Sequence, residues 1–324
     1  MGVGEVNSSP RADGTGDTAS MATARNDVES EEPSPAHPAP AWFDTALATA
    51  VECGEVAVAG VPIRYRGWGE RGTSGLLLVH GGAAHARWWD HVAPLLSSER
   101  RVVAIDLSGH GDSGRRSAYS LELWADELMA VIGDGGISGP AIIIGHSMGG
   151  FVTLRAASRF GDELAGVVTV DSPIRTITPE EEAASRRKAF GPLQTYSTRE
   201  EILKRFRPIP EQEALPYVRA HVAETSIREV DGGWTWKFDP QVFGRASLTP
   251  AVLSRLQCRV ALFRAQHGLV SAGMGEMMYD RLGRVAPVIE IPDAGHAVML
   301  DQPLAFVTGI RTLLADWEHS LPHR

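Results

Sequence analysis

The sequence predicts an α/β fold, in which helices cover both faces of a mainly parallel sheet. Short runs rich in Val, Ile and Leu alternate with stretches whose apolar residues recur at helical spacing, and this alternation is typical of a parallel sheet. Because the runs are too short for helices and almost continuously apolar, we expect them to be buried strands. They occupy residues 75–80, 100–106, 141–146, 164–171, 259–265 and 288–292.

The N-terminal part of the chain changes character at about residue 40. Residues 1–40 are rich in Gly, Ser, Thr, Asp, Glu and Pro. Such a segment buries too little apolar surface to offset the entropy of ordering, so we predict a disordered tail. Met21 is an alternative start of translation. Beyond the tail, AWFDTALATAV predicts a short helix, and EVAVAGVPIRYRGWG predicts a two-stranded hairpin that turns at Ala59-Gly60.

Helices are predicted between and after the buried runs. In residues 120–132 and in the last segment of the chain, the apolar side chains fall on one helical stripe. The stripes consist of Leu121, Trp124, Leu128 and Val131 in the first helix, and of Leu304, Val307, Ile310, Leu314 and Trp317 in the second.

One long interval, residues 172–256, contains no buried run. It is charged and interrupted by prolines, which favours several short helices. We therefore predict that residues 172–256 form a helical cap, inserted into a core made of residues 41–171 and 257–324.

Length and composition fit one soluble globular core with a smaller lid. The 324 residues are 43% hydrophobic and 22% charged. A net charge of -9 without any basic run argues against a nucleic-acid partner. Cys53 and Cys258 lack metal-ligand spacing, so we expect reduced thiols. We see no secretory signal and no apolar run of membrane length, and expect a cytoplasmic protein without a membrane span. The oligomeric state stays open.

The stretch AIIIGHSMGG places Ser147 between a predicted strand and a predicted helix. A Gly-x-Ser-x-Gly pattern is weak by itself, but a nucleophile elbow requires this strand and this helix around it. Gly145 and Gly149 fit that geometry, because the strained turn has no room for neighbouring side chains. Ser147 is therefore predicted to be a nucleophile. The alternative is a serine in an ordinary turn between a strand and a helix.

A nucleophilic serine needs backbone N–H groups that bind the oxyanion of its tetrahedral intermediate. The N–H of Met148, directly after the nucleophile, is one predicted donor. The second should come from the loop after the run 75–80, where glycines let the backbone approach a substrate closely. We predict Gly82 for this role, with Ala83 as second choice. The alternative is that these glycines only turn the chain.

These motifs and three others occur in the order that is typical of the α/β-hydrolase fold superfamily. From about residue 55 to its end, the chain therefore resembles that superfamily. The resemblance implies an eight-stranded, mainly parallel sheet, a variable cap between strands 6 and 8, and an active site beneath the cap. It is specific for the fold and weak for the substrate. The motifs are HGG at 80–82, DLSGHGDSG at 106–114, GHSMGG at 145–150, VDSP at 170–173 and DAGHAVMLDQP at 293–303.

The resemblance also implies the base and the acid of a catalytic triad. The family's base lies on the loop after the last strand, where His296 stands. Its acid usually follows strand 7, but the sequence there is QHGLVS, and His267 is no anion that could orient and stabilise an imidazolium. Some relatives place the acid after strand 6, where Asp171 stands. We predict Asp171 as the acid, with Glu276, Asp280 or no carboxylate as alternatives.

Further residues in these motifs are expected to be structural. The three histidines of the motifs should pack or form hydrogen bonds, although His146, beside the nucleophile, could touch a substrate. The two aspartates that flank the loop of His296 are expected to be structural. The tryptophans after the oxyanion loop and in the cap are expected to lie in a core more often than against a ligand, although substrate pockets are usually apolar and aromatic. The residues concerned are His80, His110, His146, Asp293, Asp301, Trp88, Trp89, Trp234 and Trp236.

The sequence thus predicts a serine hydrolase that cleaves an ester or related acyl bond of a small apolar or amphipathic molecule, with no cofactor and no metal. A lactonase, a cofactor-free haloperoxidase-like enzyme and a carbon-carbon bond hydrolase of the same fold are alternatives. Epoxide hydrolases and haloalkane dehalogenases are disfavoured, because they use aspartate at the position of Ser147. A non-catalytic ligand-binding relative is a rival from another class, and the missing strand-7 acid favours it.

Overall fold

The computed structural model describes residues 38–176, 178, 180, 193–244 and 248–320. Most of the predicted tail and parts of the predicted cap lie outside these residues. Helix α1 (Ala41–Ala48) follows the last residues of the tail, as predicted.

Within the described residues, eight strands form one sheet in the order β1-β2-β4-β3-β5-β6-β9-β10. β1 pairs antiparallel with β2, and β2 with β4, whereas all other neighbours are parallel. The mainly parallel eight-stranded sheet is therefore confirmed, as is the hairpin that turns at Ala59-Gly60. The strands are β1 (Glu52–Val58), β2 (Val61–Trp68), β3 (Gly75–Val79), β4 (Arg101–Ile105), β5 (Ala141–His146), β6 (Leu164–Val170), β9 (Arg259–Ala265) and β10 (Val288–Ile291).

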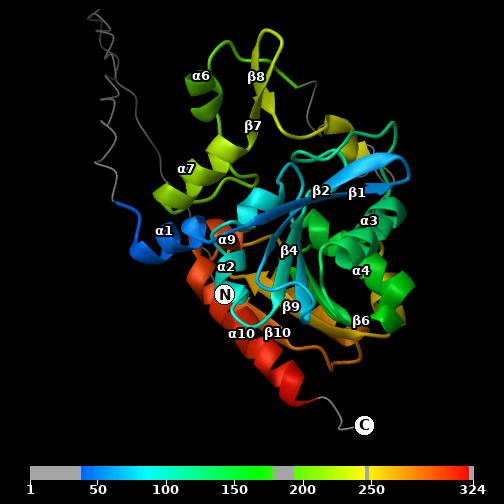
Figure 1. The fold of residues 1–324 in the computed structure, drawn as a ribbon. Helices are drawn as coiled ribbons and strands as arrows, with labels where there is room; N and C mark the ends of the chain where they lie inside the picture. The colour runs from blue at the N-terminus through cyan, green and yellow to red at the C-terminus, as the bar shows by residue number, and fades with distance from the viewer. Residues whose placement is uncertain (1–37, 177, 179, 181–192, 245–247, 321–324) are drawn as a thin grey trace, which may run out of the picture. The chain divides into compact units, whose positions relative to one another are not determined.

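Helices cover both faces of this sheet (Figure 1). α3 and α4 pack together on one face, and α10 packs near α2 and β10 on the other. The helix predicted over 120–132 begins after Ser120, whose side chain accepts a hydrogen bond from Leu123 N–H and so caps the helix. The remaining helices of the core are α2 (Ala93–Leu96), α3 (Leu121–Asp134), α4 (Met148–Phe160), α8 (Ala272–Arg281), α9 (Val298–Asp301) and α10 (Pro303–His319), with 3₁₀ turns η1 (Ala86–Trp89) and η2 (Gly161–Glu163).

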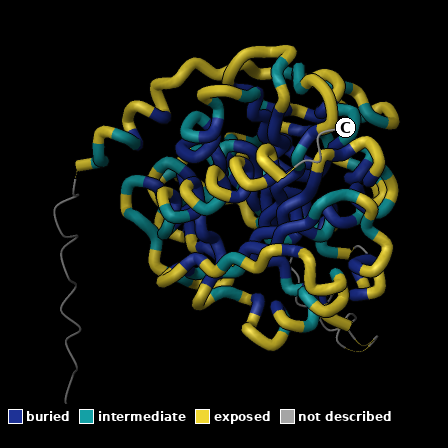
Figure 2. Tube along the Cα trace, turned by 90° about the horizontal axis from the view of Figure 1, so that it is seen from below, coloured by how far each residue is buried: buried dark blue, intermediate teal, exposed yellow. Residues whose placement is uncertain are grey.

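Alternate residues of the central strands point to opposite faces and supply two apolar cores. In β3, Leu76 and Leu78 join the core beneath α10, while Leu77 and Val79 join the core beneath α3 and α4. All four side chains are fully buried, and each stabilises the fold by about 1.5–3 kcal/mol relative to exposure. Figure 2 shows this buried sheet inside more exposed helices and loops. The cores fix the ends of the strands, which carry the site described below.

The chain between β6 and β9 forms an insertion that contains helices and also a β-hairpin, which the sequence analysis missed. β7 and β8 pair antiparallel around the two-residue turn Asp231-Gly232. The signal is present, because Asp-Gly between short strands is typical of a hairpin, but the charges and prolines of this interval favour short helices. The elements are α6 (Arg199–Leu203), α7 (Pro216–Thr225), β7 (Ile227–Val230), β8 (Gly233–Trp236), η3 (Pro240–Gly244) and η4 (Pro250–Arg255).

Polar contacts tie the insertion, which we continue to call the cap, to the core. Tyr119 Oη donates to Asp239 Oδ2 over 2.9 Å, and His221 Nε2 lies 3.1 Å from Asp90 Oδ2. The cap boundaries at residues 172 and 256 stay a proposal. No helix among the described residues combines the length and the apolar character needed to cross a membrane.

Candidate active site

Ser147 lies at the sharp turn between β5 and α4. Its backbone has φ 53° and ψ -116°, a conformation that residues other than glycine rarely adopt. Its N–H donates to Val170 O over 2.9 Å, which joins the turn to the end of β6. Ser147 is only partly buried, whereas its neighbours His146 and Met148 are buried. A strained turn of this kind is typical of a nucleophile elbow.

The flanking glycines are required by close packing. A Cβ on Gly145 would lie 2.3 Å from Thr153 Oγ1, and a Cβ on Gly149 would lie 2.5 Å from His80 O. Atoms cannot approach so closely, so any other residue at either position would displace the turn that holds Ser147.

A chain of two hydrogen bonds joins Ser147, His296 and Asp171. The His296 Nε2 atom lies 2.9 Å from Ser147 Oγ, and the Nδ1 atom lies 2.7 Å from Asp171 Oδ2. Because a carboxylate only accepts, Nδ1 carries the proton and Nε2 presents its lone pair to the serine hydroxyl. The structure thus brings together the three residues that the sequence predicted as a triad, from the ends of β5, β6 and β10.

Asp171 lies directly after β6 and is completely buried. Its carboxylate also accepts hydrogen bonds from the N–H groups of Leu269 at 2.7 Å, Val270 at 3.1 Å and Ala265 at 3.3 Å. Burial by itself would raise the pKa of Asp171, but the hydrogen bond from His296 and those from the backbone outweigh it and lower the pKa. The carboxyl is therefore held as an anion beside the imidazole.

The loop after β9 leaves room for the Asp171 carboxylate. A Cβ on Gly268 would lie 2.3 Å from Asp171 Oδ2, so the Asp171 carboxylate occupies the space that a side chain at this position would fill. His267 is largely exposed and points to Asp293, 3.8 Å away. The alternative acids Glu276 and Asp280 are exposed and pair with Arg284.

Of the two residues predicted to supply oxyanion donors, Met148 follows the serine directly, and Gly82 belongs to a loop that approaches the serine through Gly81. Met148 is the first residue of α4, so its N–H precedes the hydrogen-bond ladder of the helix. A Cβ on Gly81 would lie 3.3 Å from Ser147 Cβ, and one on Gly82 would lie 3.9 Å from Met148 Sδ. The Phe243 ring of the cap covers Gly82, with Cε1 2.8 Å from that same Cβ position. Phe243 was not predicted from the sequence, because no motif distinguishes it.

The two motif histidines nearest the serine hold the loops around it. His80 Nδ1 donates to Gly81 O over 2.7 Å, and its Nε2 accepts from Leu107 N–H over 3.1 Å. Burial lowers the pKa of His80 to about 4, so the ring is neutral. His146 Nε2 donates to His296 O over 2.9 Å, and burial followed by the neighbouring His296 lowers the pKa of His146 to about 3. Both therefore form hydrogen bonds as expected.

The two tryptophans that follow the predicted oxyanion loop are buried in the core. Trp89 is completely buried and packs near Phe306 of α10. Trp88 is buried against Phe206, with ring centroids 6.2 Å apart. Both indoles therefore pack as core residues.

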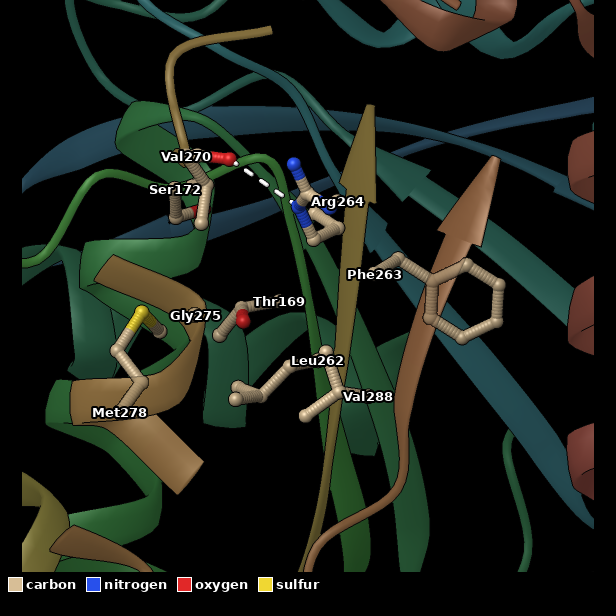
Figure 3. Close-up of a pocket in the computed structure, with 9 residues that line it drawn as sticks. All are labelled: Thr169, Ser172, Leu262, Phe263, Arg264, Val270, Gly275, Met278 and Val288. Atoms are coloured by element: carbon tan, nitrogen blue, oxygen red, sulfur yellow. Dashed lines mark hydrogen bonds between the residues drawn. The ribbon is translucent and has the colours of Figure 1, made fainter. Parts of the chain in front are cut away.

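A small cavity lies between the sheet and α8. It has a volume of about 10 Å³ and is lined by residues of β6, β9, α8 and β10, including Thr169, Leu262 and Met278 (Figure 3). Figure 3 also shows Arg264 donating to Val270 O, over 3.3 Å. Such a volume suits at most one water molecule, so this cavity is not a substrate pocket. Within the described ranges, no group of three or more His, Cys, Asp or Glu side chains is placed to hold a metal ion.

Comparison with known proteins identifies the family. The model of the alpha/beta hydrolase family matches residues 76–308, well over half of the chain. The chain belongs to the alpha/beta hydrolase family.

Individual relatives of this alpha/beta hydrolase are distant. Esterase Rv0045c of Mycobacterium tuberculosis is 24% identical over 247 residues, which is 74% of this chain and 82% of that protein. The pimeloyl-[acyl-carrier protein] methyl ester esterase of Sodalis glossinidius is 34% identical over 110 residues, 33% of this chain and 41% of that enzyme. The crystal structure of E-2-(acetamidomethylene)succinate hydrolase has a TM-score of 0.70 at 21% identity, covering 82% of this chain and all of that one, a likeness of fold.

Proposed function

We propose that this alpha/beta hydrolase is a serine hydrolase that cleaves an ester or related acyl bond of a small apolar or amphipathic molecule. The observation that carries the proposal is the hydrogen-bonded chain from Ser147 Oγ through His296 to Asp171. The esterase names of two similar proteins support the choice of an ester. The reaction needs no cofactor, because the nucleophile, the base and the oxyanion donors all come from this chain.

The first half of the reaction transfers the acyl group to the enzyme. Ser147 Oγ attacks the carbonyl carbon while His296 Nε2 takes the hydroxyl proton, and the resulting imidazolium is stabilised by the Asp171 carboxylate. The carbonyl oxygen becomes an oxyanion that the N–H groups of Gly82 and Met148 bind. When the tetrahedral intermediate collapses, His296 gives its proton to the leaving alcohol, and an acyl-enzyme remains.

The second half releases the acid. His296 removes a proton from a water molecule, the resulting nucleophile attacks the acyl carbonyl, and the same oxyanion donors stabilise the second intermediate. Collapse of this intermediate returns the proton from His296 to Ser147 Oγ and releases the carboxylic acid.

Other reactions that this fold catalyses remain candidates for the natural reaction of this protein. Lactone hydrolysis uses the same steps with the alcohol tethered to the acyl group, and carbon-carbon bond hydrolysis and cofactor-free haloperoxidation also keep a serine. Ser147 disfavours epoxide and haloalkane hydrolysis, whose alkyl-ester intermediate requires a carboxylate nucleophile. The missing strand-7 acid favours a non-catalytic relative, whereas the hydrogen bond from His296 to Asp171 supports a catalytic protein.

Hydrolysis of p-nitrophenyl esters tests the proposal. The wild type should hydrolyse short-chain esters, and Ser147→Ala should lower kcat by about 10⁶-fold, the loss known for a serine protease nucleophile. A series of acyl chains and lactones would then define the substrate class. Absence of hydrolysis by the wild type across that series would overturn the proposal, as would a Ser147→Ala variant that keeps wild-type kcat.

A further inference from the structure

A glutamine of the cap holds the loop that carries His296. This histidine loop, residues 292–297, runs irregularly between β10 and α9. Gln212 lies between α6 and α7, and its Oε1 accepts from Ala297 N–H over 2.7 Å. Its Nε2 donates to Ala297 O over 3.4 Å and to Asp301 Oδ2 over 2.9 Å. One amide thus binds both backbone groups of the residue that follows His296.

The carboxylate of Asp301 completes this arrangement. Asp301 Oδ2 also accepts from Gly295 N–H over 2.6 Å, so the residues on both sides of His296 are bound to one connected pair of side chains. A second bond from the same part of the cap, Leu215 N–H to Leu300 O over 2.9 Å, fixes the cap segment against the start of α9.

No repeating secondary structure replaces these bonds if Gln212 is removed. Ala297 is only 3% exposed, so its N–H would be left without a partner or ready access to water, and its C=O, which keeps the bond from Leu300 N–H at 2.8 Å, would lose its second donor. The loop would have to shift to satisfy them, and the position of His296 Nε2 relative to Ser147 Oγ would shift with it. A displacement of about 1 Å in an active site lowers a rate by about 10²-fold.

We propose that Gln212 is a positioning residue, through which the cap holds His296 in line with Ser147 and Asp171. The proposal rests on the proposed function, because it assumes that His296 is the base. Gln212 acts on the base and not on the substrate. Its removal should therefore lower kcat and leave KM almost unchanged, whereas the loss of a substrate contact would raise KM.

Steady-state hydrolysis of p-nitrophenyl acetate by the full chain separates these roles. Gln212→Ala should lower kcat by about 10²-fold with KM changed by less than about threefold. Gln194→Ala is the matched control, because Gln194 is an exposed glutamine of the same cap, and among the described residues its side chain bonds Tyr196 and no residue of the histidine loop. Its kcat should equal that of the wild type. Thermal unfolding of each variant shows whether it is folded.

A second variant keeps the proposal testable if Gln212→Ala does not fold. In Gln212→Glu, the introduced carboxylate would face Asp301 Oδ2 and Ala297 O and could not donate to either. Burial already raises the pKa of Asp301 to about 6, and a second carboxyl would raise it further. Lowering the pH from about 8 to about 6 should let the pair share a proton, which restores a donor. The kcat ratio of variant to wild type should therefore rise as the pH falls.

The outcomes distinguish the two proposals. If the wild type hydrolyses the ester but Gln212→Ala keeps the wild-type kcat, with or without a raised KM, the positioning role is wrong and the proposed function stands. A pH-independent ratio for Gln212→Glu also overturns the positioning role. If the wild type does not hydrolyse the ester, the proposed function falls and this inference falls with it.

Discussion

At the scale of single residues, the site depends on where one carboxylate lies. Asp171 is completely buried, yet its oxygens accept from three backbone N–H groups and from His296. A buried anion is stable only when hydrogen bonds of this kind replace its water. The same bonds fix the tautomer of His296, which leaves Nε2 free to accept the proton of Ser147.

Replacing this carboxylate tests its role directly. In Asp171→Asn the amide presents an N–H either to His296 Nδ1–H or to the backbone donors of Leu269 and Val270, so one donor faces another. The imidazole then loses its proper tautomer, and kcat for a p-nitrophenyl ester should fall by about 10⁴-fold. Glu276→Gln is the control and should retain wild-type kcat. The reverse pattern would assign the acid to Glu276.

Asp106, a buried carboxyl that takes no part in the proposed reaction, makes stability depend on pH. It lies after β4 and accepts from Ala86 N–H over 2.6 Å and Asp112 N–H over 2.9 Å. Burial raises its pKa from 3.8 to about 6. Between these values the folded protein holds a proton that the unfolded chain has released, so the contribution of Asp106 to stability is largest below about pH 4 and is lost as the pH rises through about 6.

Thermal unfolding between about pH 4 and about pH 6 checks this dependence. Asp106→Asn carries no titrating group at this position, so the Tm of the wild type should fall relative to that of the variant as the pH rises. Other titrating groups are common to both proteins and cancel in the difference. A difference in Tm that stays constant across this range contradicts the assignment.

At the scale of elements, the loop after β9 supplies backbone donors to an acid that lies after β6. Neighbouring parallel strands end at the same edge of the sheet, so the two positions share one space. Gly268 keeps that space open, because its missing side chain leaves room for the Asp171 carboxylate.

Adding one methyl group to this loop should disturb the acid. A Cβ introduced by Gly268→Ala would lie 2.3 Å from Asp171 Oδ2, so the carboxylate or the loop must move, and kcat should fall by about 10²-fold. Gly273→Ala is the matched control, since a Cβ at that helical position meets nothing within 4 Å. This control should keep wild-type kcat and gain slight thermal stability. Equal kcat in both variants would show that the acid tolerates the displacement.

At the scale of the whole molecule, the core followed from the sequence because its signals are local. Six apolar runs and two helical stripes each predicted an element that the structure contains, and Gly145 and Gly149 marked the turn at Ser147. The run at 288–292 was wrongly expected to be buried, because β10 is an edge strand with exposed residues. The hairpin of the cap was missed because the charges around Asp231-Gly232 outweighed the turn signal. Contacts between the cap and the site, such as those of Gln212 and Phe243, join residues far apart in the sequence and have no local pattern.

The central proposal is that Ser147 is a nucleophile activated by His296. The most direct measurement is covalent labelling of the intact protein with a fluorophosphonate, followed by mass spectrometry of the labelled peptide. Phosphonylation requires an activated serine and does not depend on knowing the natural substrate. We expect a single adduct on Ser147 in the wild type and none in Ser147→Ala. An unlabelled wild type, or an adduct that persists in Ser147→Ala, would contradict the claim.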